Sequence, residues 1–101
     1  MNRKVKRGGG VAIIYNTEVI TIEEPDVIIP HNLEIVWGIA RPRKGTIKVI
    51  IIAAFYYPPK AKKKKNMINH IVSTIHTLLT SRMDAEIVIA GDKNELDLSL
   101  V

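Results

Sequence analysis

Two polar residues after a short apolar run are the strongest candidates for chemistry in this chain of 101 residues. Residues 87–90 are apolar, which is typical of a buried strand, and Gly91 ends the run. Asp92 and Asn94 then stand two positions apart, so an extended backbone would place both side chains on one side. A carboxylate and an amide presented together can hold a metal-bound water and a phosphate oxygen. The alternative interpretation is an ordinary turn, in which both residue types are common.

A second candidate is the pair of tyrosines that ends the longest apolar run, residues 49–57. Pro58 and Pro59 follow and lack an amide hydrogen, so the strand is expected to stop there. The hydroxyl of Tyr56 or Tyr57 could then face a site at the strand end. Composition alone makes both residues ordinary interfacial aromatics.

The densest positive charge is a run of lysines before the expected helix, made up of Lys60, Lys62, Lys63, Lys64 and Lys65. Such a run is commonly a solvated face, and it is also able to contact nucleic-acid phosphates. No aromatic residue is interleaved, which argues against a stacking platform for single strands. The formal net charge of +5 favours a polyanionic partner.

The histidines give no sign of a metal site or a catalytic triad. His70 and His76 are six positions apart, so they do not share one face of a helix. His31 lies in a polar loop with no second ligand nearby, and no acid completes a triad with the serine and threonines of the helix. We expect all three to be ordinary loop or helix residues.

The elements that must position these groups begin with a helix over residues 66–82. Its apolar residues recur at spacings of three and four and form one stripe, which consists of Met67, Ile68, Ile71, Val72, Ile75, Leu78 and Leu79. Such a stripe suits a helix that covers one face of a sheet. Asn66 is the expected N-terminal cap.

Strands are expected on both sides of that helix. Residues 11–15 and 18–22 are expected to form a hairpin, and residues 27–29 a brief strand. The alternation in residues 33–40 predicts a strand with Trp37 in the core. Residues 46–55 are expected to return antiparallel beside it.

Turn chemistry supports that return, because Pro42 fixes its backbone angle and Gly45 can adopt a positive φ. A sheet that is apolar on both faces needs a covering layer on each face, and one helix supplies a single layer. The expected fold class is therefore α+β, with part of the covering missing.

Size and composition indicate one small domain. There is no cysteine, which excludes disulfides and thiolate metal sites and fits a reducing compartment. No apolar run approaches the length of a membrane span, and Gly8, Gly9 and Gly10 stand where a signal peptide needs an apolar stretch. We expect an intracellular protein of the nucleus or cytoplasm, neither secreted nor membrane-bound, with a mobile basic arm over residues 1–7.

Three segments together resemble the endonuclease/exonuclease/phosphatase superfamily, in its branch of retroelement-encoded, apurinic-type endonucleases. Residues 7–13 look like the Gly-Gly-Val-Ala-Ile strand of that branch, residues 56–59 like its Tyr-x-Pro-Pro, and residues 91–94 like its Gly-Asp-x-Asn. The segments occur in the family's order, with a helix between the second and the third. The resemblance implies that residues 8–101 are the central part of such a domain, incomplete at both ends.

The fold implied by this resemblance is a fragment of a four-layered α/β sandwich of the DNase I type, with a mixed sheet and one long covering helix. The implied activity is hydrolysis of a phosphodiester with Mg²⁺ or Mn²⁺. By position, Asp92 would orient and deprotonate the attacking water, and Asn94 would hold that water or a phosphate oxygen. Both would approach the metal. Tyr56 would hydrogen-bond the phosphate or assist the leaving oxygen.

The chain also departs from the family pattern. Lys93 stands where the family commonly has an apolar residue, and no histidine follows an aspartate as in the family's Ser-Asp-His motif. The family's metal-binding glutamate has no counterpart in this chain. The sequence around that glutamate in the family does not occur around any of these residues: Glu18, Glu23, Glu24 and Glu34.

We therefore expect a partial, retroelement-derived endonuclease domain that acts on nucleic acid, with DNA as the first candidate, and is inactive as an isolated chain. Its other expected partners are the missing parts of the same domain or a reverse transcriptase. One alternative is a non-catalytic module that binds nucleic acid through the lysines of residues 60–65, and another is an unconstrained remnant with no activity.

Overall fold

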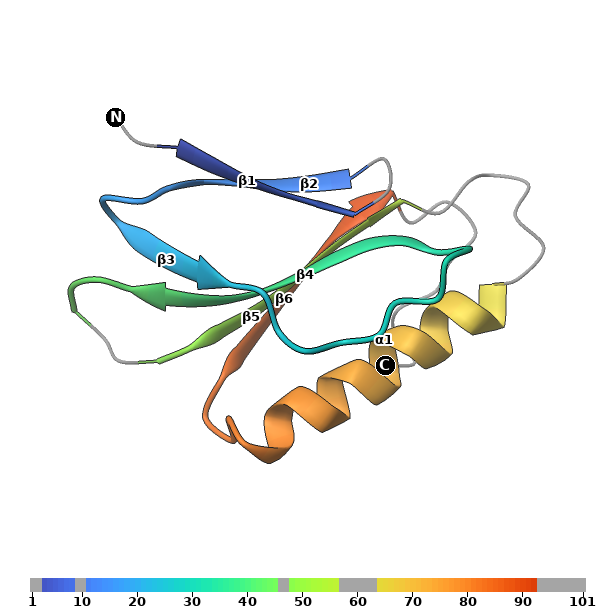
Figure 1. The fold of residues 1–101 in the computed structure, drawn as a ribbon. Coiled ribbons are helices and arrows are strands. Elements are labelled where there is room, and N and C mark those ends of the chain that lie inside the picture. Colours follow the sequence, from blue (N-terminus) through green and yellow to red (C-terminus); the bar gives the residue numbers. More distant parts are fainter. Residues whose placement is uncertain (1–2, 9–10, 46–47, 57–63, 93–101) are drawn as a thin grey trace.

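The computed structural model describes residues 3–8, 11–45, 48–56 and 64–92 of the chain (Figure 1). Within these residues the elements follow one another in the order β1 (Arg3–Gly8), β2 (Val11–Asn16), β3 (Ile20–Glu23), β4 (Glu34–Pro42), β5 (Ile50–Tyr56), α1 (Lys64–Thr80) and β6 (Glu86–Asp92). The fold class is α+β, as expected from the sequence.

The strands form two sheets. Strands β3 to β6 make a mixed sheet in the order β3-β4-β5-β6, and β1 pairs antiparallel with β2 in a sheet of two strands. Strand β4 runs antiparallel to β3 and β5, whereas β5 and β6 are parallel. A parallel pair needs a crossover connection, and α1 lies in it (Figure 1).

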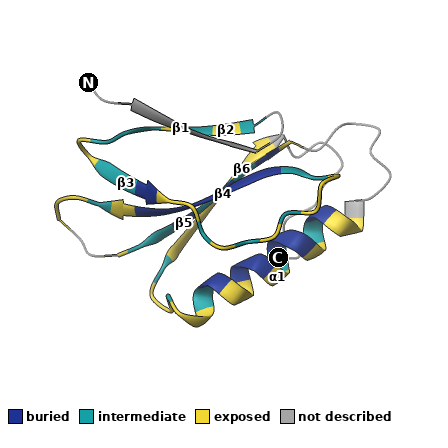
Figure 2. Cartoon of the chain, in the orientation of Figure 1, coloured by how far each residue is buried: buried dark blue, intermediate teal, exposed yellow. Residues whose placement is uncertain are grey.

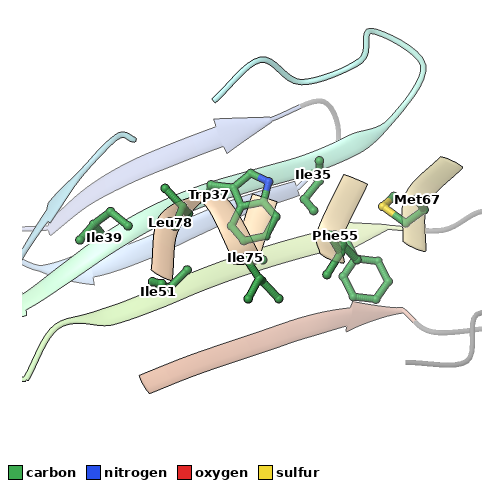
Figure 3. Packing of buried hydrophobic residues seen from close by; sticks show 10 residues of the cluster. Ile35, Trp37, Ile39, Ile51, Phe55, Met67, Ile75 and Leu78 are labelled. Carbon is green, nitrogen blue, oxygen red and sulfur yellow. The ribbon is translucent and has the colours of Figure 1, made fainter. Parts of the chain in front are cut away.

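The hydrophobic core lies between α1 and the mixed sheet. Alternate residues of β4 and β5 face the helix, and the apolar stripe of α1 packs onto them (Figures 2 and 3). The buried members are Ile35, Trp37, Ile39, Ile51, Ala53, Phe55, Met67, Ile71, Ile75 and Leu78. Full burial of one large apolar side chain contributes about 1.5–3 kcal/mol, so this layer is the main source of stability.

The β1–β2 pair lies on the other side of the mixed sheet from α1 (Figure 1). On that face of β4, Val36, Gly38 and Ala40 are buried. A Cβ atom added to Gly38 would lie 2.8 Å from Cγ2 of Ile22, on the neighbouring strand β3, and 3.5 Å from Cδ1 of Ile13, on β2, so side chains of both sheets pack over this glycine. The described residues therefore form three layers: helix, mixed sheet and strand pair.

Several expectations from the sequence are confirmed. Residues 33–40 fall largely in β4, the return strand β5 is antiparallel to it, and Trp37 is only 2% exposed. The helix exists but runs from Lys64 to Thr80, two residues earlier at each end than expected. Asn66 therefore lies within the helix and is not its cap.

Two strand predictions are wrong. Residues 18–22 do not form a hairpin with residues 11–15, because β2 pairs with β1 and β3 pairs with β4. The turn itself forms, with the amide of Glu18 donating to Oδ1 of Asn16 at 2.9 Å, but the strands on its two sides enter different sheets. Residues 27–29 form no strand, since Val27 turns back to donate to the carbonyl of Pro25 at 2.9 Å.

Two further expectations are corrected at the ends of the described chain. Residues 3–7 of the basic arm expected over residues 1–7 lie in β1, which pairs along its whole length with β2. The run at 87–90 forms a strand that is not buried: Val88 is 47% exposed. Within the described residues β6 has a neighbouring strand on one side only, which explains this exposure.

Candidate functional site

The register of the parallel strands places Tyr56 directly beside Asp92. These residues are the last of β5 and β6, and their Cα positions are partners in the ladder. Because the carboxyl ends of parallel strands meet at one edge of a sheet, two of the predicted site residues lie at the same edge although a helix separates them in sequence. Asn94, the third predicted site residue, lies outside the described residues.

A glycine allows the close approach of the two strand ends. Gly91 pairs with Phe55 and has a φ of +157°. A Cβ atom added there would overlap the carbonyl oxygen of Phe55, and it would lie 2.9 Å from the carbonyl carbon and from ring atom Cδ1 of the same residue. A side chain at this position would therefore push β6 away from β5, next to Asp92.

Glu34 extends the row onto a third strand. It pairs with Tyr56 across the antiparallel ladder of β4 and β5, so Glu34, Tyr56 and Asp92 occupy one row across the sheet. Positions directly opposite in a sheet belong to the same face. Glu34 was not predicted as a site residue, because its place in this row depends on the register of the β4–β5 hairpin.

Glu34 and Tyr56 lie on the face of the sheet opposite α1, since the residues that face the helix are Ile35 and Phe55, one position away. Tyr56 is 37% exposed and Glu34 is half-buried, so groups from solution can reach this edge. A phenolic hydroxyl can donate a hydrogen bond to a phosphate oxygen, and a carboxylate can accept a proton.

The donor chemistry of the row suits a hard cation, because carboxylate oxygens are preferred ligands of Mg²⁺. In the part of the chain that the structure describes, however, no three histidine, aspartate or glutamate residues gather in a group that could hold a metal ion. Glu34 and Asp92 could supply two carboxylates. Further ligands would have to come from elsewhere.

Most of the predicted lysine cluster lies outside the described residues, which exclude Lys60, Lys62 and Lys63. Lys64 is the first residue of α1, and Lys65 in its first turn is exposed. The helix starts close after the carboxyl end of β5 in sequence, so these two lysines follow the same strand end as Tyr56.

The three histidines differ in their environment. His31 and His76 are exposed, as expected for loop and helix residues. His70 is buried, and its Nε2 accepts a hydrogen bond of 3.0 Å from Nε1 of Trp37. The sequence places His70 on the apolar face of the helix, because it follows Met67 by three positions, but it does not indicate Trp37 as the partner.

A cavity of about 980 Å³ lies at the opposite end of the sheet, between the start of β5 and the segment that connects α1 to β6. Its lining includes cations that already have acidic partners: Arg41 pairs with Glu23 at 3.0 Å, and Lys48 pairs with Glu86 at 3.6 Å. Arg82 and Asp84 also line this cavity, so its lining carries charges of both signs.

Comparison of the chain with models of known protein families, with curated proteins and with solved structures gives no match. Among the described residues, no helix combines the length and the apolar composition that crossing a membrane requires.

Proposed function

We propose that this chain carries part of a metal-dependent phosphodiesterase site of the endonuclease type, acting on nucleic acid, within a sandwich of the DNase I type. The observation that carries the proposal is the register of β5 and β6, which aligns Tyr56 with Asp92 at one edge of the sheet. These residues belong to two of the three segments that resemble the retroelement endonucleases. Their neighbourhood in space is what a shared site requires.

In the proposed reaction Asp92 accepts a proton from the water that attacks phosphorus, and the bond from phosphorus to the leaving oxygen breaks. Tyr56 donates a hydrogen bond to a phosphate oxygen as negative charge develops there. Asn94 holds the water or a phosphate oxygen. A bound Mg²⁺ or Mn²⁺ would stabilise the charge on the phosphate, with Asp92 and Asn94 as the proposed ligands.

Metal binding at this edge can be tested without measuring catalysis. The backbone amide signals are followed by NMR during titration with Mn²⁺, which broadens nearby resonances. We expect the signals of Tyr56 and Asp92 to broaden first, and Mg²⁺ to compete. Asp92→Asn should remove the effect, while Asp84→Asn, an exposed aspartate at the other end of β6, should leave it unchanged. Broadening that is unaffected by Asp92→Asn would refute the proposed site.

Catalysis is tested separately, by nicking of a supercoiled plasmid in Mg²⁺. We expect activity of the isolated chain at the level of the blank, because the family's metal-binding glutamate and Ser-Asp-His motif have no counterpart here. Magnesium-dependent nicking that is lost in Asp92→Ala would contradict this expectation and show that the chain holds a complete site.

The competing function is a basic module that binds nucleic acid without cleaving it. Binding of a labelled duplex that falls by about 0.9 log units per decade of salt for each phosphate contact would indicate such a surface. Loss of this binding in a double variant, Lys62→Ala with Lys63→Ala, together with full binding by Asp92→Ala and no metal-dependent broadening, would favour the module over the phosphodiesterase.

A further inference from the structure

A polar contact joins α1 to the mixed sheet inside the apolar core. The indole Nε1 of Trp37, on β4, donates to Nε2 of His70, on α1, at 3.0 Å. The two rings meet edge to face, with centroids 5.8 Å apart and planes at 70°. Trp37 is 2% exposed and His70 is 8% exposed, so water does not compete for this bond.

The geometry fixes the protonation state of the histidine. An indole N–H is a donor only, so Nε2 of His70 must offer its lone pair, and the proton of the neutral ring must sit on Nδ1. A second proton would occupy Nε2. The hydrogen bond to Trp37 and the doubly protonated ring therefore exclude each other.

No charged group among the described residues faces His70 to compensate a positive charge. The facing positions of β4 and β5 are apolar, and on α1 the neighbours Lys65 and His76 are exposed. Glu34 belongs to the opposite face of β4, and Arg41, several positions along the strand, is paired with Glu23. The loop before β4 packs its apolar residues against the core, while its titratable residues are exposed: Glu24, Asp26 and His31.

We propose that the Trp37–His70 pair is a proton-sensitive latch, which holds α1 on the sheet when His70 is neutral and releases the helix when His70 is protonated. The inference does not depend on the proposed phosphodiesterase site, because it rests on the core contact alone.

The direction of the effect follows from linkage. Burial lowers the pKa of His70 below its ordinary value of 6.5. At pH values between the lowered pKa and 6.5, His70 is protonated in the unfolded chain and neutral in the folded chain. The unfolded chain therefore binds more protons, so the free energy of unfolding rises with pH. The contribution of the latch is complete above pH 6.5 and is lost as the pH falls through the lowered pKa of His70.

The chain has one tryptophan, so fluorescence of Trp37 reports on this pair directly. In a titration from pH 8 to pH 4.5, we expect a step in Trp37 emission with its midpoint below 6.5, matched by a fall in the urea midpoint over the same range. His70→Gln should remove the step. His31→Gln and His76→Gln, which alter exposed histidines, should retain it.

A measurement on the unaltered chain tests the proposal even if the His70 variant does not fold. Long-range ¹⁵N–¹H correlation of the imidazole should show the Nδ1–H tautomer at pH 7.5 and titration of His70 together with shifts of the α1 amides. An Nε2–H tautomer at neutral pH would overturn the proposal. So would a fluorescence step that persists in His70→Gln, or titration of His70 without any change in α1.

Discussion

The contact between Gly91 and Phe55 leads to a specific prediction. One substitution at Gly91 should change both the free energy of unfolding and the position of the strand end that carries Asp92. In Gly91→Ala the added methyl group would overlap the carbonyl oxygen of Phe55 and lie 2.9 Å from its carbonyl carbon. Backbone atoms cannot move aside as the end of a side chain can. Strand β6 must therefore move away from β5 by on the order of 1 Å, which is enough to break neighbouring ladder hydrogen bonds.

The expected loss of stability has two parts. Overpacking of this kind costs about 1–3 kcal/mol, and each ladder hydrogen bond that is lost adds about 1 kcal/mol. We expect Gly91→Ala to be destabilised by about 2–4 kcal/mol in urea denaturation, with an unchanged slope. The amide signals of Tyr56 and Asp92 should shift most, because the displaced strand end carries Asp92.

A matched control separates the collision from the backbone angle. Gly45 also has a positive φ, +88°, but a Cβ atom there would meet nothing within 4 Å. Gly45→Ala should therefore cost only the left-handed conformation, about 1–2 kcal/mol. If Gly91→Ala proves no more destabilising than Gly45→Ala, or leaves the β6 amides unshifted, the close approach of the two strands is refuted.

Three further outcomes are expected. Ile71→Ala, in the core, should lose about 2–5 kcal/mol in urea denaturation, whereas Ile28→Ala, at a side chain that is 92% exposed, should stay within about 0.5 kcal/mol. Tyr56→Phe should keep stability within about 0.5 kcal/mol because the residue is exposed at a strand end, as denaturation at pH 7 can measure. Val88→Lys should reduce aggregation measured by light scattering more than Ile28→Lys, because a lysine on an outer strand blocks edge pairing.

Each of these outcomes can be contradicted by a specific result. Equal losses at positions 71 and 28 would deny that α1 packs on the sheet. A large loss in Tyr56→Phe would show that the hydroxyl has a structural role. Equal light scattering by the two lysine variants would mean that net charge, and not the edge of β6, controls aggregation.

Alternation and spacing were sufficient to predict the central part of the fold. The period of two in residues 33–40 identified β4 and the burial of Trp37, and the three- and four-residue spacing identified α1. These patterns report which side chains are buried, and burial is what the sequence encodes most directly. The same patterns could not indicate that β2 pairs with β1, because pairing depends on which edges meet.

Less of the candidate site than of the fold could be predicted from the sequence. Asp92 and Tyr56 were chosen by residue type and motif, but their alignment depends on the register of a parallel pair joined by a helix. Glu34 was not predicted, since only the hairpin register brings it opposite Tyr56. The Trp37–His70 bond was missed because a histidine in an apolar stripe gives no indication of its partner.

The place of β4 in the middle of the structure has a consequence for hydrogen exchange. It is flanked by β3 and β5, covered by α1 on one face and by the β1–β2 pair on the other, and its residues 35–40 are all buried. Opening its ladder exposes all four of these neighbours at once, so its amides should exchange only through global unfolding, whereas β6 should open through local fluctuations. We therefore expect slow exchange at the centre of the described structure and faster exchange at the end of β6, where the candidate site lies.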